Sequence, residues 1–263
     1  MPRERADKVV VSRGLAESRA RAQALILAGQ VLVRDQRVDK PGQLIDSEAE
    51  IRIKGEAPRY VSRGGLKLEA ALSAFAIDPR GKVCIDVGAS TGGFTDCLLQ
   101  HGAERVWAID VGHNQLAWRI RQDPRVEVIE GLNARSLDPN HFPSRFDLAS
   151  IDVSFISLTK ILPSVYNVLG EPSDCVALVK PQFEVGKGEV GRGGIVTDPA
   201  GHKRVLLEIE AAARDVGFTV DGLIESPILG AEGNREFLMH LRRGGEATPP
   251  PSIRERIELL VKP

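Results

Sequence analysis

The sequence predicts an α/β protein in which a small α+β domain precedes a doubly wound, mostly parallel sheet. From residue 66 to residue 243, β-branched runs alternate with helical patterns across short loops, which is typical of parallel strands joined by crossover helices. One of these runs ends in an acidic residue followed by clustered glycines, a usual place for a ligand in such sheets. The chain has 263 residues and is 42% hydrophobic, which suits packed domains of this size.

Residues 1–58 are predicted to form the small domain. Two helical patterns come first, and Gly29 ends the second of them. Short strands then lie on either side of a turn at Lys40-Pro41-Gly42. In order, the predicted elements are helices at 3–11 and 17–28 and strands at 31–33 and 50–54. The first 59 residues carry 12 Lys or Arg and 9 Asp or Glu, a charge of +3 against −4 for the remainder, which favours this end as the contact for a polyanion.

A linker at residues 59–65 is predicted to lead into the large domain, residues 66–244. Its last two strands are expected to form an antiparallel pair. The predicted strands are 82–87, 105–110, 126–130, 146–151, 175–180, 218–225 and 235–242, and the predicted helices are 66–76, 93–101, 114–121, 157–169 and 199–216. Residues 245–263 are predicted to be a C-terminal tail with a proline spacer and a short amphipathic helix.

The glycine turn within residues 83–97 carries the most informative motif. It reads Val-Cys-Ile-Asp-Val-Gly-Ala-Ser-Thr-Gly-Gly-Phe-Thr-Asp-Cys, and its glycines let the backbone approach a bulky ligand. A dinucleotide fingerprint is excluded because Ser90 replaces the second glycine, and a phosphate-binding P-loop because Phe94 follows Gly93. The turn resembles the first motif of S-adenosyl-L-methionine (SAM) methyltransferases, which implies a Rossmann-like seven-stranded domain with SAM as cofactor. The motif residues expected to bind the cofactor are Asp86, Gly88, Ser90, Thr91, Gly92, Gly93 and Phe94.

Two further residues are predicted to bind the cofactor from neighbouring strand ends. Asp110 ends the second strand of the large domain about 20 residues after the glycine turn, where a carboxylate accepts hydrogen bonds from ribose hydroxyls. Asn133 follows the third strand, where its amide either pairs with the edge of adenine or makes an ordinary turn.

The N-terminal domain resembles the small RNA-binding fold named after ribosomal small-subunit protein four. The resemblance covers residues 3–56 and depends on Ser-Arg-Ala-Arg at 18–21 and Ala-Gly-Gln-Val-Leu-Val at 28–33. It implies that guanidinium groups bind phosphate oxygens of folded RNA. The candidate RNA-binding residues are Arg5, Arg13, Ser18, Arg19, Arg21, Arg34 and, in the linker, Arg63. Interleaved acidic residues keep the positive patch modest.

Four charged residues of the large domain match the Lys-Asp-Lys-Glu tetrad of the FtsJ-like ribose 2′-O-methyltransferases, which this domain resembles. They are Lys67, Asp152, Lys180 and Glu236. The resemblance implies methyl transfer to a ribose 2′-hydroxyl, with Lys180 either a general base or an ammonium that orients the hydroxyl and stabilises the developing oxyanion. Methylation of a base is disfavoured, because residues 152–155 lack the two prolines of enzymes that alkylate exocyclic amines.

The two domains together are similar to the TlyA family, sometimes labelled hemolysin A, over residues 3–243. This resemblance implies 2′-O-methylation of cytidine in ribosomal RNA, on an assembled ribosomal subunit. Two other classes of function stay open at this point, namely a SAM-binding assembly factor without catalysis and a membrane-lytic protein. The lytic alternative is disfavoured because the sequence has no export signal, no long apolar span and no strongly basic amphipathic helix.

The remaining composition argues against metal and disulfide chemistry. The three cysteines are far apart, at least two of them within apolar runs, and are expected to be reduced and structural. The five histidines are scattered and no CxxC or HExxH spacing occurs, so no metal site is expected. In the absence of an apolar N-terminal region, no membrane contact is expected and the protein is predicted to be cytoplasmic.

Overall fold

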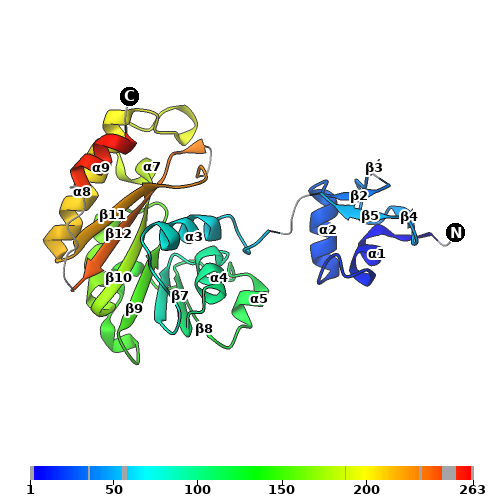
Figure 1. Ribbon diagram of the computed structural model, residues 1–263, viewed down its shortest axis with the longest axis horizontal. Helices are drawn as coiled ribbons and strands as arrows, with labels where there is room; N and C mark the ends of the chain where they lie inside the picture. Colours follow the sequence, from blue (N-terminus) through cyan, green and yellow to red (C-terminus); the bar gives the residue numbers. More distant parts are fainter. Residues whose placement is uncertain are drawn as a thin grey trace. The chain divides into compact units, whose positions relative to one another are not determined.

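The computed structural model describes residues 3–34, 36–54, 58–186, 188–230, 233–244 and 253–261. The chain forms two compact units, Met1–Arg59 and Tyr60–Pro263 (Figure 1). Each unit has its own hydrophobic core: among the described residues, one cluster of buried apolar side chains lies within the first unit and two lie within the second. Each therefore has the packing that an independently folding domain requires.

The first unit combines two helices with short strands. Ser18 caps the second helix, because its hydroxyl accepts a hydrogen bond from the Arg21 N–H. β2 lies between β3 and β5, and β1 pairs with β4, all in antiparallel register. The elements are β1 (Arg3–Arg5), α1 (Ala6–Ser12), α2 (Arg19–Leu27), β2 (Val31–Val33), β3 (Gln36–Arg37), β4 (Leu44–Asp46) and β5 (Ile51–Ile53).

The first predicted helix is wrong at its start. Residues Arg3–Arg5 are extended and pair with β4, so α1 begins only at Ala6. The backbone N–H groups of Ala6 and Asp7 then donate to the carbonyls of Gln43 and Pro41. A helical pattern in the local sequence does not reveal this pairing, because the partner strand lies far along the chain.

The second unit contains one seven-stranded sheet in the order β11-β12-β10-β9-β6-β7-β8. Strands β6 to β10 pair in parallel, and β12 runs antiparallel to both of its neighbours. The predicted seven-stranded fold with a final antiparallel pair is confirmed. The strands are β6 (Val83–Val87), β7 (Arg105–Asp110), β8 (Val126–Glu130), β9 (Phe146–Ile151), β10 (Leu169–Val179), β11 (Thr219–Glu225) and β12 (Phe237–Arg243).

Helices cover both faces of this sheet, as a doubly wound fold requires (Figure 1). Successive residues of one strand enter different cores: Ile85 and Val87 belong to the core that contains residues of α6, α8 and α9, whereas Cys84 belongs to the core that contains residues of α3 and α4. The helices are α3 (Gly64–Ala74), α4 (Gly93–Gln100), α5 (Trp118–Arg121), α6 (Leu162–Val168), α7 (Pro181–Glu184), α8 (Pro199–Val216) and α9 (Ile253–Leu260). The segment predicted as one helix at 157–169 instead contains a 3₁₀ turn at Leu158–Lys160, followed by α6.

Both ends of the second unit differ from the predicted boundaries. Tyr60 is buried, and α3 starts at Gly64, so all of the predicted linker except Arg59 belongs to the folded unit. At the other end, α9 packs against α8 and β11 with Ile253 and Ile257 in the core. The predicted tail helix is therefore part of this unit, because its apolar stripe completes the core. The proline spacer lies outside the described residues.

Candidate cofactor and catalytic site

The glycine turn after β6 has no room for a side chain at Gly88. This residue has a φ of +88°, and a Cβ built there would lie 2.4 Å from the carbonyl oxygen of Asp152. The Gly88 N–H donates to the carbonyl of Ile109 on β7 at 2.8 Å. The turn is therefore held closely between the ends of β7 and β9, where a parallel sheet places its ligand.

Asp86, near the end of β6, forms buried hydrogen bonds beneath this turn. Its carboxylate accepts hydrogen bonds from the hydroxyls of Thr95 (2.7 Å) and Ser150 (2.9 Å) and has no exposed surface. Burial raises the pKa of Asp86 to about 6, although both hydroxyls lower it. Asp86 was predicted to bind the cofactor, but its fully buried side chain points into the core at the junction of β6, β9 and α4.

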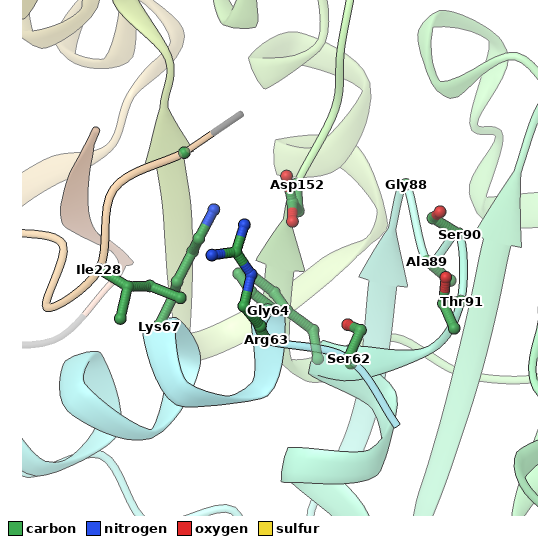
Figure 2. A pocket seen from close by; sticks show the side chains of 13 residues that line it. Ser62, Arg63, Gly64, Lys67, Gly88, Ala89, Ser90, Thr91, Asp152 and Ile228 are labelled. Carbon is green, nitrogen blue, oxygen red and sulfur yellow. The ribbon is translucent and has the colours of Figure 1, made fainter. Parts of the chain in front are cut away.

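Two cavities of about 240 and 540 Å³ lie along the turn and share Gly88, Ser90 and Asp152. Small-molecule sites span roughly 300–1,000 Å³, so together they suit a ligand of cofactor size. The smaller cavity is lined by Ser62, Arg63, Gly64, Lys67, Gly88, Ala89, Ser90, Thr91, Gly93, Phe94, Asp152, Ile228 and Gly230 (Figure 2). The larger cavity also includes Asp110, Gln115, Asn133, Arg135, Ser154 and Phe155.

Of the predicted cofactor residues, the structure brings all except Asp86 and Gly92 to these walls. Gly92 faces away from the cavities: it has a φ of +96°, and a Cβ there would lie 2.8 Å from Leu116. Asp110 accepts hydrogen bonds from the N–H groups of Ser90 (2.8 Å) and Gly112 (2.7 Å), which fix its carboxylate on the cavity wall. Asn133 is on the wall too, and its Oδ1 accepts from the Arg135 N–H at 3.1 Å as a turn cap.

The four predicted catalytic residues form two adjacent ion pairs. Lys67 Nζ lies 2.5 Å from Glu236 Oε2, and this pair is buried, with 9% and 2% of the residues exposed. Lys180 Nζ lies 2.5 Å from Asp152 Oδ1 and also donates to Ser154 Oγ at 3.1 Å. Because Lys67 and Asp152 both line the smaller cavity, the two pairs meet at the end of the glycine turn.

Strand ends bring these four residues together. Asp152 follows β9 and Lys180 follows β10, at the carboxyl edge of the parallel strands. Glu236 precedes β12, which runs in the opposite direction and therefore starts at the same edge. Lys67 lies on the buried face of α3, and Figure 2 shows its side chain directed into the space beside Asp152. Gly230 covers Glu236, because a Cβ there would lie 2.0 Å from the carboxylate.

Residues 62–64 line the smaller cavity, which the sequence analysis missed. The Val61 N–H donates to Asp96 Oδ2 at 2.8 Å, and Asp96 also pairs with Arg119 at 2.5 Å. This anchors Ser62 and Arg63 beside the glycine turn. Arg63 was predicted to bind RNA, but it lines the smaller cavity (Figure 2). The signal in the sequence was the glycine pair at 64–65, which indicates close packing of the backbone. In the structure, a Cβ at Gly65 would lie 2.3 Å from the Tyr60 ring.

An aromatic pair beside the ion pairs, exposed Phe155 and half-buried Phe183, was also missed. Phe155 is 91% exposed with a φ of +63°, and its ring centroid lies 4.9 Å from that of Phe183. Phe183 in turn lies 6.0 Å from Lys180 Nζ. A bulky residue in the left-handed region is uncommon, and one that holds its ring in solvent is a candidate for ligand contact. The signal in the sequence was the phenylalanine directly after Asp152-Val153-Ser154.

The predicted RNA-binding residues of the first unit have different partners. Arg5 and Arg19 both bind the carboxylate of Asp7. Arg13 instead donates to the backbone carbonyls of Ala49 (2.9 Å) and Ser47, so it joins two parts of the fold. The remaining predicted residues are Ser18, which caps α2, Arg21, which is half-buried on α2, and Arg34, which pairs with Asp46 at 2.8 Å.

The described part of the chain shows neither a metal-binding cluster nor a membrane-spanning helix. No group of three or more His, Cys, Asp or Glu is arranged to hold a metal ion among the described residues. None of the described helices is long and apolar enough to cross a bilayer. The cysteines Cys84, Cys97 and Cys175 are buried and form no disulfide, and burial raises the pKa of Cys84 to about 12. Such a thiol stays protonated and is a poor nucleophile.

Two protein families match the chain. Residues 60–243 match the FtsJ-like methyltransferases, and residues 4–51 match the S4 domain. The S4 match ends before the boundary at Arg59 between the two units, and the methyltransferase match begins directly after it. The C-terminal helix α9 lies outside both matches.

Proteins similar in sequence cover nearly the whole chain. "Putative rRNA methyltransferase YqxC" of Bacillus subtilis is 51% identical over 93% of this chain and 87% of its own length. "16S/23S rRNA (cytidine-2'-O)-methyltransferase TlyA" of Mycobacterium tuberculosis is 46% identical over 91% of this chain and 90% of its own. The solved structure "Putative hemolysin from Streptococcus thermophilus" is 47% identical, with a TM-score of 0.76 over 99% of this chain and 95% of that one.

Proposed function

This chain belongs to the FtsJ-like methyltransferases, and within them to the TlyA family, and we propose that it transfers a methyl group from SAM to the ribose 2′-oxygen of a cytidine in ribosomal RNA. The observation that carries this proposal is the meeting of the two ion pairs, Lys67–Glu236 and Asp152–Lys180, at the end of the glycine turn. A factor that only binds SAM has no need for four charged groups at the place where the methyl group reacts.

The cavity walls suit SAM in shape and polarity. The backbone at Gly88 leaves a cradle that a Cβ would fill, and Asp110 on the larger cavity suits ribose hydroxyls. In the smaller cavity, Ser62 and the guanidinium of Arg63 suit the carboxylate of the methionine part. When bound, SAM supplies a methyl group on a positively charged sulfur, which is a good leaving group.

Replacing Gly88 with alanine is expected to weaken SAM binding by at least about tenfold, because the new Cβ must displace the Asp152 backbone and the residue must keep a positive φ. Titration calorimetry measures this effect and should detect no binding of NAD to the unsubstituted protein. Gly81→Ala is the control: its φ is +68°, but nothing lies within 4 Å of its Cβ, so SAM affinity should be unchanged. Equal affinities of both variants would contradict the proposed cradle.

Within this arrangement, the protein holds the hydroxyl and removes its proton. The ribose 2′-hydroxyl is a weak nucleophile at neutral pH and must be held in line with the methyl–sulfur bond. We assign Lys180 to accept its proton in the uncharged form, with Asp152 stabilising the ammonium that results. Lys67, fixed by Glu236, donates to the same oxygen. Bound SAM would supply the methyl group to this oxygen, and the proton that the hydroxyl loses would remain on Lys180.

The substrate class follows from the surroundings of the ion pairs. A ribose inside a duplex cannot reach a recessed site, so the target nucleotide must be unstacked. The exposed ring of Phe155, packed against the half-buried ring of Phe183, is suited to stack on its base beside Lys180. The S4 domain supports RNA as the polymer, and we extend this to an assembled ribosomal subunit as the physiological substrate, which places the reaction in the cytoplasm.

Mapping of 2′-O-methyl groups in ribosomal RNA tests this function. RNA from cells that produce the protein is compared with RNA from cells that lack it. At least one cytidine is expected to lose its 2′-O-methyl group in the deletion strain and regain it on complementation. If the 2′-O-methyl sites of the two strains are identical, the proposed activity is contradicted.

A further inference from the structure

Asp7 is a fully buried carboxylate that organises the surface of the first unit. Arg5 donates to it twice, from Nε to Oδ1 at 3.0 Å and from Nη2 to Oδ2 at 2.9 Å. Arg19 Nε and Gln23 Nε2 donate to the same Oδ2, each at 2.9 Å. Asp7 itself has no exposed surface, whereas the side chains of Arg5 and Arg19 are 42% and 53% exposed.

The two arginines come from different elements and both contact this carboxylate. Arg5 ends β1, and Arg19 begins α2. Since Arg19 uses only its Nε here, its two terminal amino groups lie outside the contact with Asp7. Gly42 lies against the Arg5 guanidinium, because a Cβ there would be 3.2 Å from Nη1. The result is two half-exposed guanidinium groups fixed next to each other.

The charge of this cluster remains positive. The Arg5 guanidinium beside Asp7 holds the pKa of that carboxyl well below its usual range, so one negative charge stands against two positive ones. Guanidinium groups are planar and present several donors, which match the oxygens of a phosphate. Long side chains that are already fixed lose less conformational entropy when they bind.

We propose that Asp7 is a positioning residue, which holds Arg5 and Arg19 together as one binding site for a phosphate group of the RNA backbone. The inference rests on the proposed function in one respect, since it takes ribosomal RNA as the ligand of the first unit. It goes further by assigning a role to a buried acidic residue that does not itself contact the RNA.

If Asp7 positions the two arginines, its replacement should change RNA affinity in the opposite direction to that expected from charge alone. Asp7→Asn removes a negative charge close to the RNA, so simple electrostatic attraction predicts equal or tighter binding. Positioning predicts weaker binding, because an amide no longer holds two guanidinium groups in one geometry. The plot of log affinity against log salt concentration should also become less steep, by about one unit of slope, as expected for a lost phosphate contact.

The experiment measures binding of the full chain to transcribed large-subunit ribosomal RNA by filter binding at several salt concentrations. We expect Asp7→Asn to bind roughly tenfold more weakly at about 150 mM salt, with the reduced slope. Amide hydrogen exchange of α2 and β2 checks that the first unit stays folded. Equal or tighter binding by the folded variant would overturn the proposal.

Arg19→Lys carries the test if Asp7→Asn unfolds the first unit. The substitution keeps the charge at a half-exposed position but replaces the fork of donors with a point charge. Binding should weaken severalfold, whereas the control Arg37→Lys, at a similarly exposed arginine that pairs with Asp39, should bind as the unsubstituted chain does. Equal effects of the two lysine variants would overturn the proposal. RNA affinities that follow this pattern without any methyl transfer would support Asp7 positioning and contradict the proposed function alone.

Discussion

Replacing Lys180 with alanine is expected to lower the rate of methyl transfer by about 1,000-fold while SAM affinity stays within about tenfold. The amine lies 2.5 Å from Asp152 and 3.1 Å from the Ser154 hydroxyl, and among the described residues it is not on the wall of either cavity. Its loss therefore removes the proton acceptor but little of the cofactor site. Single-turnover methylation measures the rate, and titration calorimetry measures the affinity.

Two further variants separate the roles of charge and proton transfer. Lys180→Arg keeps a positive charge but cannot accept a proton, because a guanidinium stays protonated in proteins. It should be about as inactive as Lys180→Ala if the residue is a general base. Substantial activity of the arginine variant would instead assign Lys180 to orientation and charge stabilisation. Lys160→Ala, at an exposed position near the same strand edge, is the control and should be fully active.

Removal of residues 1–58 is expected to lower methylation of ribosomal RNA by at least about 100-fold while SAM binding is retained. The second unit keeps its cofactor cavities and both of its cores, because these contain only residues from Tyr60 onward. What is lost is the S4 domain and its arginines, so the effect should lie in binding of the RNA. Calorimetry with SAM and methylation assays over a range of RNA concentrations test both parts.

The shortened protein distinguishes two accounts of the first unit. A raised KM for RNA with a nearly unchanged kcat would place its contribution in substrate binding. Full activity at low RNA concentration would contradict a role for the first unit and leave recognition to the second. The variant Arg13→Ala in the full chain is expected to act through stability, since Arg13 binds two backbone carbonyls.

The sequence predicted most of the large unit because its signals are local. Each parallel strand is a short β-branched run, and the residues that follow β9 and β10 must reach the same edge of the sheet. For this reason Asp152 and Lys180 could be expected to lie together, and the structure places them in one ion pair. The glycine turn is equally local, since positive φ values and close backbone contact leave few residue types possible.

What the sequence could not predict depends on partners far along the chain. Arg13 and Arg19 look alike in the sequence, yet one binds the backbone near Ala49 and the other binds Asp7. The same holds for Arg63, which faces the cofactor cavity because Asp96 anchors the segment before it. Packing of α9 against α8 and β11 is also long-range, so its amphipathic pattern alone did not reveal where it packs.

The position of the transferred methyl group tests the central claim most directly. The protein is incubated with ribosomal subunits and SAM that carries a deuterated methyl group, and the RNA is then digested to nucleosides for mass spectrometry. We expect one labelled nucleoside, a cytidine whose sugar fragment carries the added mass, and none with Lys180→Ala. A label on the base fragment, or no label although calorimetry shows bound SAM, would contradict methyl transfer to a ribose oxygen at the two ion pairs.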